Sequence, residues 1–484
     1  MADAVAAPTA TRHWRDLPGP RGVPVFGSAL AMDKSRVHEH FAEWSRRYGP
    51  YVRVRIGPRR LLLVSDHAVI ARMLRDRPDH YRRPTNQDRI VREMGFAQGL
   101  FFANDDAWRR QRRMVMAALD PTHVKAFVPT LLTVVERLRV RWEGTSRRGA
   151  VLDLQAELMR YTVDVIAGLA FGSDVNTIGS DDDVIQRHLN LIFPAISRRV
   201  VASMPYWRWI RLPADRALER AVREVNAAIA GFIAGARARL EVEPERRQRP
   251  RDLLEAMIVA AEAEPGEPGE SRADDVAGNV FIMLVAGEDT TANTLAWLLD
   301  FLFRHPDSLA RAREEVLRVA PDHRSFTLAQ IGELEFVDAC IQETMRLKPV
   351  APLIAGQAVA ESVVGDVAID PGTFVVGVMR HDATDATHFP DPLRFDPERW
   401  LGGAAGSPDA RSPHRVSMPF GAGPRLCPGR YLALVEMKML IAMLLANFEL
   451  ESVGTADGSA AREVFAFAMG PAGLRMRLAP RVAA

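Results

Sequence analysis

The sequence predicts a mainly α fold with a smaller β-rich portion, on three observations. Helical periodicity dominates from Asp105 to about Ala320, in long segments of Ala, Leu, Val and Arg. Alternating or apolar runs broken by turns occur in two zones, Tyr51–Asp66 and Leu353–Arg380. These two zones lie far apart along the chain. We therefore expect the β portion to belong to the same fold as the helices.

The individual elements follow from local signals. Leu17–Ser28 is rich in Pro and Gly and cannot be regular helix. Tyr51–Asp66 alternates and then becomes apolar around Gly57-Pro58, which predicts a β-hairpin. Leu353–Arg380 predicts a second group of shorter strands. The chain then returns to helix in the segment that begins LCPGRYLALVEMKML.

Composition bounds the class of protein. The 484 residues are 48% hydrophobic and 26% charged, which is typical of a globular protein. A net charge of +2 gives no reason to expect nucleic acid as a partner. We expect one domain over residues 1–484, with residues 1–16 flexible and residues 262–275 forming an exposed acidic loop.

Cysteine usage and hydropathy indicate the location. Two cysteines argue against a disulfide framework, and the N-terminus has no signal-peptide run and no membrane span. The longest apolar tract, near Asn279–Phe303, contains Glu288 and Asp289, which a lipid-facing helix would not tolerate. We expect this tract to be a helix buried in protein. We also expect the protein to be cytoplasmic and monomeric. The scarcity of lysine relative to arginine suggests a bacterial gene.

One cysteine lies in an unusual segment, FGAGPRLCPG, from Phe420 to Gly429. A lone cysteine is usually a small buried hydrophobe, and we interpret Cys340 in that way. Around Cys427, however, glycines permit close backbone approach, and a following helix N-terminus favours a thiolate. The guanidinium group of Arg425 can bind a carboxylate through two parallel hydrogen bonds. This context favours a metal-ligating thiolate.

The buried helix carries AGEDTT, Ala286–Thr291. An acid beside a hydroxyl in an apolar helix is costly unless it has partners or a task. Ala286 and Gly287 leave room for a flat group against the helix. The alternative is purely structural, with a Thr hydroxyl bonded back to a carbonyl of its own helix. The residues alone do not decide between the two.

Two further segments place side chains together on helices. Glu343 and Arg346 are three residues apart and can pair. Trp108 and Arg112 lie on one helical face at i, i+4. Both spacings are also common on solvated helices.

Taken together, these segments resemble the cytochrome P450 family. Phe420, Gly423, Arg425, Cys427 and Gly429 match its haem-loop pattern Phe-x-x-Gly-x-Arg-x-Cys-x-Gly. The resemblance implies a P450 fold with a long central helix over haem b, and Cys427 as the thiolate ligand of its iron. The residues that it implies to contact haem are Trp108, Arg112, Ala286, Phe420, Gly421, Arg425 and Gly429.

The resemblance also implies roles in catalysis and support. Asp289 and Thr290 would relay protons during dioxygen cleavage, as the catalytic pair of the family does. Glu343, Arg346 and Arg399 would form a buried triad that holds the cysteine loop in place. Gln357 stands where many members have a propionate-binding arginine, so that contact is in doubt.

The implied activity is that of a monooxygenase, which inserts one oxygen atom from O2 into a hydrophobic small molecule. Pro428–Ala484 is too short for a reductase domain and no nucleotide-binding fingerprint precedes it, so we expect a separate ferredoxin or flavodoxin with an NAD(P)H-dependent reductase. This partner would dock on a basic face of Arg109, Arg110, Arg113, Arg430 and Lys438.

By family position, apolar side chains line the substrate pocket: Met94, Phe96, Leu100, Leu284, Leu353, Ile354, Phe465 and Phe467. Such a lining suits a hydrophobic ligand. Two alternatives remain open. One is a haem-thiolate enzyme that uses peroxide or isomerises an oxygenated substrate, and the other is a non-catalytic haem sensor. Neither needs Asp289 and Thr290.

Overall fold

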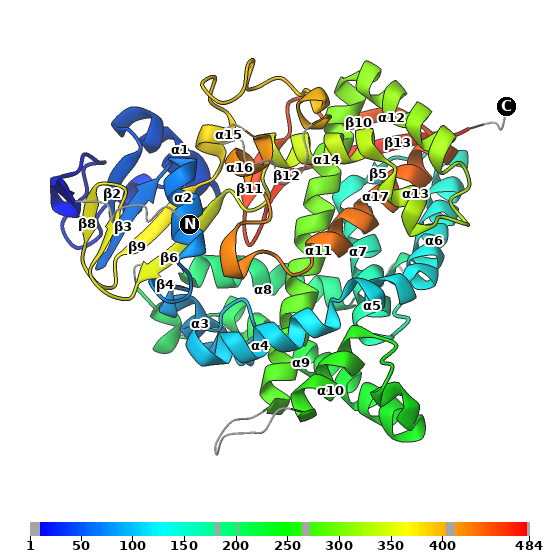
Figure 1. Ribbon diagram of the computed structural model, residues 1–484, viewed down its shortest axis with the longest axis horizontal. Helices are drawn as coiled ribbons and strands as arrows, with labels where there is room; N and C mark the ends of the chain where they lie inside the picture. The colour runs from blue at the N-terminus through cyan, green and yellow to red at the C-terminus, as the bar shows by residue number, and fades with distance from the viewer. Residues whose placement is uncertain are drawn as a thin grey trace, which may run out of the picture.

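A computed structural model describes residues 10–179, 184–200, 202, 204–263, 272–402 and 412–481. Helices make up most of it, and the larger sheet lies to one side of them, at the left of Figure 1. The predicted mainly α fold with a smaller β-rich portion is confirmed. None of the helices in these ranges combines the length and the apolar character needed to cross a membrane.

The helices vary from single turns to more than thirty residues. Their bounds are α1 Val37–Tyr48, α2 His67–Arg75, α3 Thr85–Glu93, α4 Asp105–Ala118, α5 Pro121–Ala126, α6 Val128–Arg147, α7 Leu154–Phe171, α8 Val184–Val200, α9 Pro213–Val242, α10 Leu253–Ala263, α11 Arg272–Arg304, α12 Pro306–Val319, α13 Leu328–Gly332, α14 Glu335–Leu347, α15 Arg380–Ala383, α16 Pro413–Ser417 and α17 Arg430–Asn447.

The strands form four small sheets. Their bounds are β1 Arg12–His13, β2 Tyr51–Ile56, β3 Arg59–Val64, β4 Tyr81–Arg82, β5 Leu152–Asp153, β6 Leu353–Ala358, β7 Ser362–Val364, β8 Val367–Ile369, β9 Phe374–Val378, β10 Phe448–Thr455, β11 Arg462–Phe465, β12 Met469–Ala472 and β13 Leu474–Pro480. The strand orders are β2-β3-β9-β6-β4, β10-β13-β5, β1-β8-β7 and β11-β12.

The two distant β zones meet in the five-stranded sheet. β2 and β3 form the predicted hairpin, with Tyr51 opposite Val64 in antiparallel register. β3 then pairs in parallel with β9, so that Leu62 lies opposite Val375. Leu62 and Val375 are both fully buried. Burying these apolar faces joins the two zones into one sheet, as their patterns predicted.

Helix α11 runs through the middle of the helical part (Figure 1). From Thr291 to Leu302 almost every side chain is buried, and the helix packs along α7. A helix that is apolar all round must be covered on all sides. The expectation of a protein-buried helix around Asn279–Phe303 is confirmed.

The N-terminal expectation needs a correction. Residues 1–9 lie outside the described ranges, but Arg12–His13 pair with β8 and Trp14 is buried. The indole Nε1 of Trp14 donates to the carbonyl oxygen of Leu61 at 2.9 Å. Burial of this large ring ties residues 12–16 to the sheet, so this part of the predicted flexible segment is ordered.

The expectation of an exposed acidic loop over residues 262–275 also needs a correction at its C-terminal end. Residues 264–271 lie outside the described ranges, while Arg272–Asp275 form the first turn of α11. Asp275 accepts from Arg110 Nε at 2.9 Å and from Gln111 Nε2 at 2.6 Å. Acidic residues are favoured at a helix N-terminus, which is why this turn is helical rather than exposed loop.

Candidate active site

The segment from Phe420 to Gly429 forms a tight loop between α16 and α17. The Cys427 N–H donates to the carbonyl oxygen of Phe420 at 3.1 Å and closes the loop. Gly423 has a positive φ of 70°, and a Cβ there would lie 2.3 Å from the carbonyl oxygen of Leu74, at the end of α2. Only glycine fits this close approach, so α2 sets the position of the loop.

The sulfur of Cys427 lies at the start of α17. Burial raises the pKa of its thiol, while the backbone N–H groups of Gly429 and Arg430 and the charges of Arg112 and Arg430 lower it. The N–H groups at this helix start therefore point at the sulfur, which is the environment that stabilises a thiolate. Arg112 lies on α4, so this helix also approaches the Cys427 sulfur.

Arg425 stacks on Trp108. Its guanidinium carbon lies 4.6 Å from the indole centroid, and Nη2 donates to the carbonyl oxygen of Ala103 at 2.7 Å. Within the described residues its buried Nε has no hydrogen-bond partner. Burial, followed by the nearby charge of Arg83, lowers the pKa of Arg425 to about 9. Trp108 and Arg425, two of the residues expected to contact haem, therefore lie against each other.

Two arginines that the sequence did not single out join this cluster. Arg83 is half-buried, with its guanidinium carbon 4.1 Å from the Phe101 ring centroid and a pKa lowered by burial to about 10, and its buried Nε lacks a partner within the described ranges. Burial and the charges of Arg83 and Arg425 lower the pKa of Arg77. Across the described chain, no carboxylate forms an ion pair with Arg77, Arg83 or Arg425. The cluster is suited to bind an anionic group.

Thr290 and Asp289 lie on α11 but do not bond to each other. The Thr290 hydroxyl donates to the carbonyl oxygen of Ala286 at 2.6 Å, which is the structural alternative considered above. Asp289 Oδ1 accepts from Asn293 Nδ2 at 2.7 Å, and Oδ2 accepts from the Ala468 N–H at 3.1 Å. Burial raises the pKa of Asp289 despite these bonds.

A small cavity adjoins this carboxyl group. It has a volume of about 160 Å³ and is lined by Asp289, Asn293 and Gln155 among mainly apolar residues. Gln155 Nε2 donates to Asn293 Oδ1 at 3.0 Å, so a chain of polar groups leads from Gln155 through Asn293 to Asp289. A cavity of this size with three polar side chains in its wall has room for water.

The structure brings Glu343, Arg346 and Arg399 together. Arg346 Nη2 donates to Glu343 Oε1 at 2.6 Å, and Arg346 Nε donates to Oε2 at 2.8 Å. Arg399 Nε lies 3.4 Å from Glu343 Oε1. Trp400 Nε1 also donates to Glu343 at 2.9 Å. Glu343 and Arg346 are completely buried, so each charge depends on the other.

The geometry of the loop and of α11 agrees with the match to known proteins. A protein-family model described as Cytochrome P450 matches residues 17–476. The chain belongs to the cytochrome P450 family.

Relatives extend over most of this P450. It is 29% identical to the human mitochondrial 25-hydroxyvitamin D-1 alpha hydroxylase, covering 92% of this chain and 88% of the relative. It is 27% identical to a cyclooctat-9-en-7-ol 5-monooxygenase of Streptomyces melanosporofaciens, covering 91% of each. The crystal structure of the cytochrome P450DA heme domain is similar with a TM-score of 0.80 at 23% identity, over 96% of this chain and 98% of that one.

Membership of the family makes the chain a P450 monooxygenase with haem as its cofactor. The residues present fit that group. Haem is held by a thiolate and carries two acidic propionates. The guanidinium groups of Arg83 and Arg425, whose buried Nε atoms lack partners in the described part of the chain, match the propionates in charge. The N–H groups beside the Cys427 sulfur match a bound thiolate.

The predicted pocket residues fall into separate clusters. Met94, Phe96, Leu100, Leu284 and Phe467 belong to or pack against the core around α11. Phe96 stacks on Phe281 of this helix with centroids 3.8 Å apart. Leu353 and Phe465 pack instead against the cluster under β2 and β3, and Ile354 packs against the one beneath α2. Their shared role as the lining of a substrate pocket stays a prediction.

Two other sequence expectations change in this P450. Lys438 is buried and its Nζ lies 3.2 Å from Asp338, and Arg110 pairs with Asp275. Neither belongs to an open basic face, because helix packing turns them toward carboxylates. Gln357 accepts from Thr85 and donates to the carbonyl oxygen of Gly372 at 3.3 Å. Its amide is thus engaged at the edge of the sheet.

Proposed function

We propose that this P450 inserts one oxygen atom from O2 into a hydrophobic small molecule, using electrons from a separate protein. The second oxygen atom leaves as water, which consumes two electrons and two protons. The observation that carries the proposal is the convergence of Cys427, with N–H donors at its sulfur, and the arginine cluster around Arg425, in which Arg77, Arg83 and Arg425 form no ion pair with a carboxylate of the described residues.

Cys427 is the proposed thiolate ligand of the haem iron, and the haem supplies the activation of dioxygen when it is bound. Cys340 is a poor alternative, because it is buried in α14 and burial raises the pKa of its thiol far above the ordinary value. Arg425, Trp108, Arg112, Arg83 and Arg77 are proposed to hold the propionates. Glu343, Arg346 and Arg399 are proposed to brace the loop.

Protons are proposed to reach the distal side through Asp289. Burial raises the pKa of its carboxyl group above the ordinary value, and the cavity that its side chain lines has room for water. Asn293 and Gln155 hold the carboxyl in place at this cavity. Thr290 lies one residue farther along α11. We propose that its hydroxyl receives the proton after its hydrogen bond to the carbonyl oxygen of Ala286 breaks.

The proposed substrate is mainly hydrocarbon. Met94, Phe96, Leu100, Leu284 and Phe467 place apolar surface beside α11. Two relatives are named for 25-hydroxyvitamin D and for cyclooctat-9-en-7-ol, both of which are largely apolar molecules.

The proposed electron donor is an acidic ferredoxin or flavodoxin. Arg430 is exposed directly after the cysteine loop, and Arg113 is exposed on α4 beside Arg112. Arg109 already pairs with Asp79 and Asp106, at 2.8 and 2.9 Å. Charge reversal at Arg430 should therefore weaken partner-supported turnover and its salt dependence more than reversal at Arg109.

Reconstituted turnover tests the function. The purified holoenzyme is incubated with a panel of terpenoids, steroids and fatty acids, either with NAD(P)H, reductase and ferredoxin or with hydrogen peroxide alone. We expect oxygenated product with the reductase system, with label from 18O2. Product with peroxide only would establish the peroxide-using alternative, and ligand binding without product in either arm would favour a sensor.

Ligand assignment needs its own variants. We expect Cys427→Ser to lose the red-shifted carbon monoxide band that thiolate ligation gives to reduced haem. Cys340→Ser, the matched control, should keep that band. Retention of the band in Cys427→Ser would contradict the assignment of the ligand while leaving the fold and family unaffected.

A further inference from the structure

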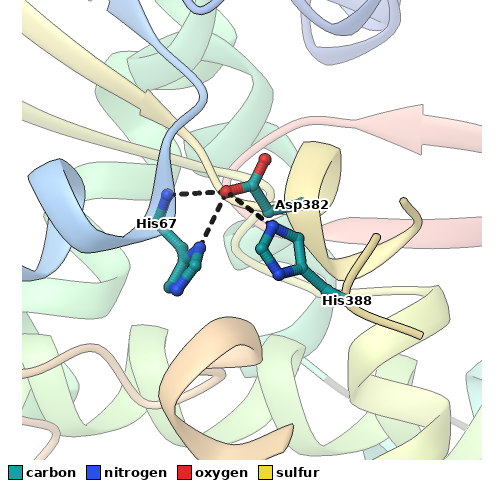
Figure 2. Close-up of side chains that lie close together, drawn as sticks. All are labelled: His67, Asp382 and His388. Carbon is teal, nitrogen blue, oxygen red and sulfur yellow. Dashed lines mark hydrogen bonds and ion pairs between the residues drawn. The ribbon is translucent and has the colours of Figure 1, made fainter. Parts of the chain in front are cut away.

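Three side chains from separate segments meet beside the five-stranded sheet, at the opposite end of α2 from its contact with the cysteine loop. Figure 2 shows His67 at the first turn of α2, Asp382 on α15, and His388 in the segment that follows α15. One ligand atom from each lies within 4.8 Å of the others. The three side chains are 13–26% exposed, so they are accessible to a small solute.

The distances suit a shared ion. His67 Nδ1 lies 2.8 Å from Asp382 Oδ2, and His388 Nε2 lies 3.7 Å from the same oxygen. Ligand atoms on a tetrahedral zinc ion, at about 2.0–2.1 Å from it, are roughly 3.3 Å apart. The two observed separations lie on either side of that value. Small side-chain rotations would bring three donors onto one ion.

The carboxylate is already oriented by its surroundings. His381 Nδ1 lies 3.0 Å from Asp382 Oδ1, and the His67 N–H donates to Oδ2 at 2.8 Å. These hydrogen bonds hold the pKa of Asp382 far below its ordinary value. Asp385 adds a second negative charge near His381 and His388. Hydrogen bonds to a ligating carboxylate are typical of metal sites, because they fix its orientation.

A second cluster in the same chain provides a contrast. His38 and Glu463 also lie close together, with Nε2 and Oε2 2.9 Å apart. There, however, Arg380 Nη1 donates to Glu463 at 2.7 Å and Lys348 Nζ donates to it at 2.5 Å. Two positive groups oppose a cation at that site. No arginine or lysine forms an ion pair with Asp382 within the described residues.

We propose that His67, Asp382 and His388 bind a divalent transition-metal ion of the zinc class, at a site separate from the haem. Two imidazole nitrogens and one carboxylate oxygen are a ligand set that such ions prefer. The ion replaces the hydrogen bond between His67 Nδ1 and Asp382 Oδ2. His381, on the other carboxylate oxygen, is a positioning residue.

Zinc binding to the tag-free holoenzyme tests this proposal. Equilibrium dialysis against ZnSO4, with metal analysis, is expected to give one zinc per chain. His67→Ala, His388→Ala and Asp382→Asn should each weaken binding by about tenfold or more. His80→Ala, which removes an exposed histidine outside the cluster, should leave binding unchanged. Zinc retained with unchanged affinity in all three variants would overturn the proposal.

The coordination sphere gives a readout that does not depend on variants. The zinc K-edge X-ray absorption spectrum of the wild-type holoenzyme should show nitrogen or oxygen ligands at about 2.0–2.1 Å, with the outer scattering of two imidazoles. If a variant fails to fold, this spectrum still decides. Absence of zinc binding, or fewer than two imidazoles in the spectrum, would show that the cluster is a hydrogen-bonded contact only.

Discussion

The side-chain amide of Asn293 donates to Oδ1 of Asp289 at 2.7 Å, and its own oxygen accepts from Gln155. Asn293 thus orients the proposed proton donor without touching substrate. We expect Asn293→Ala to lower, by about tenfold, the share of electrons that appear in product, because a misplaced carboxyl delivers protons more slowly. The measurement is the ratio of product to NAD(P)H consumed, together with the solvent isotope effect.

The control for this change is Asn226→Ala. Asn226 lies on α9 and donates to the carbonyl oxygen of Gly95 at 3.0 Å. It contacts neither Asp289 nor the small cavity. Its coupling ratio and isotope effect should equal those of the wild type. An unchanged isotope effect in Asn293→Ala would show that Asn293 does not position Asp289.

Removing the Arg425 guanidinium should loosen the haem. The arginine is buried against Trp108, with Nε free of partners in the described structure, and we propose that a propionate meets it there. A charge-assisted hydrogen bond contributes about 1.5–3 kcal/mol, so Arg425→Ala should release haem about 10- to 100-fold faster. Transfer of haem to an excess of an apo-globin measures this rate. Arg109→Ala, on the exposed face of α4, should release haem at the wild-type rate.

The buried pair of Glu343 and Arg346 should dominate local stability. Glu343→Gln leaves the completely buried guanidinium of Arg346 without its counter-charge. Such a change costs about 3–5 kcal/mol in the free energy of unfolding. Urea unfolding followed by circular dichroism measures it. Glu398→Gln, at an exposed ion pair with Arg311, should change that free energy by no more than about 1 kcal/mol. Equal losses in the two variants would contradict the proposed support role.

Stability should fall between weakly acidic and weakly alkaline pH because of Glu436. Burial raises the pKa of this carboxyl from 4.5 to about 8, and the Thr291 hydroxyl donates to it at 2.8 Å. Between these values the folded chain binds more protons than the unfolded chain does. The free energy of unfolding therefore decreases as pH rises through this window, by at most about 1.4 kcal/mol per pH unit from this group.

Glu436→Gln isolates that contribution. The amide does not ionise, so the variant should gain stability over the wild type as pH rises from 5 to about 8, and the difference should be constant above that. Thermal unfolding of the holoenzyme at several pH values provides the curve. Glu451→Gln, an exposed residue on β10, should follow the wild type. Parallel curves for Glu436→Gln and wild type would contradict a protonated Glu436.

The parts of the fold that were predictable depend on short-range patterns. The hairpin of β2 and β3 follows from alternation around Gly57-Pro58, and burial of α11 follows from its apolar periphery. The cysteine loop is likewise contiguous in the chain. By contrast, Trp14 lies in a segment whose composition suggested flexibility, and its burial depends on a contact with Leu61 of β3. A local sequence pattern cannot predict a contact between residues that lie 47 positions apart in the chain.

The sequence by itself determined the family motifs, the cofactor type and the mainly α character of the fold, because each of these depends on residues that are close together in the chain. Only the tertiary structure decided which charges lack partners. Arg77 and Arg83 looked like ordinary basic residues until burial removed them from water and from carboxylates. Lys438 looked like part of a docking face until the packing of α17 turned it toward Asp338. Burial and partnership depend on segments that meet only after folding, and they determine what a charged side chain can do.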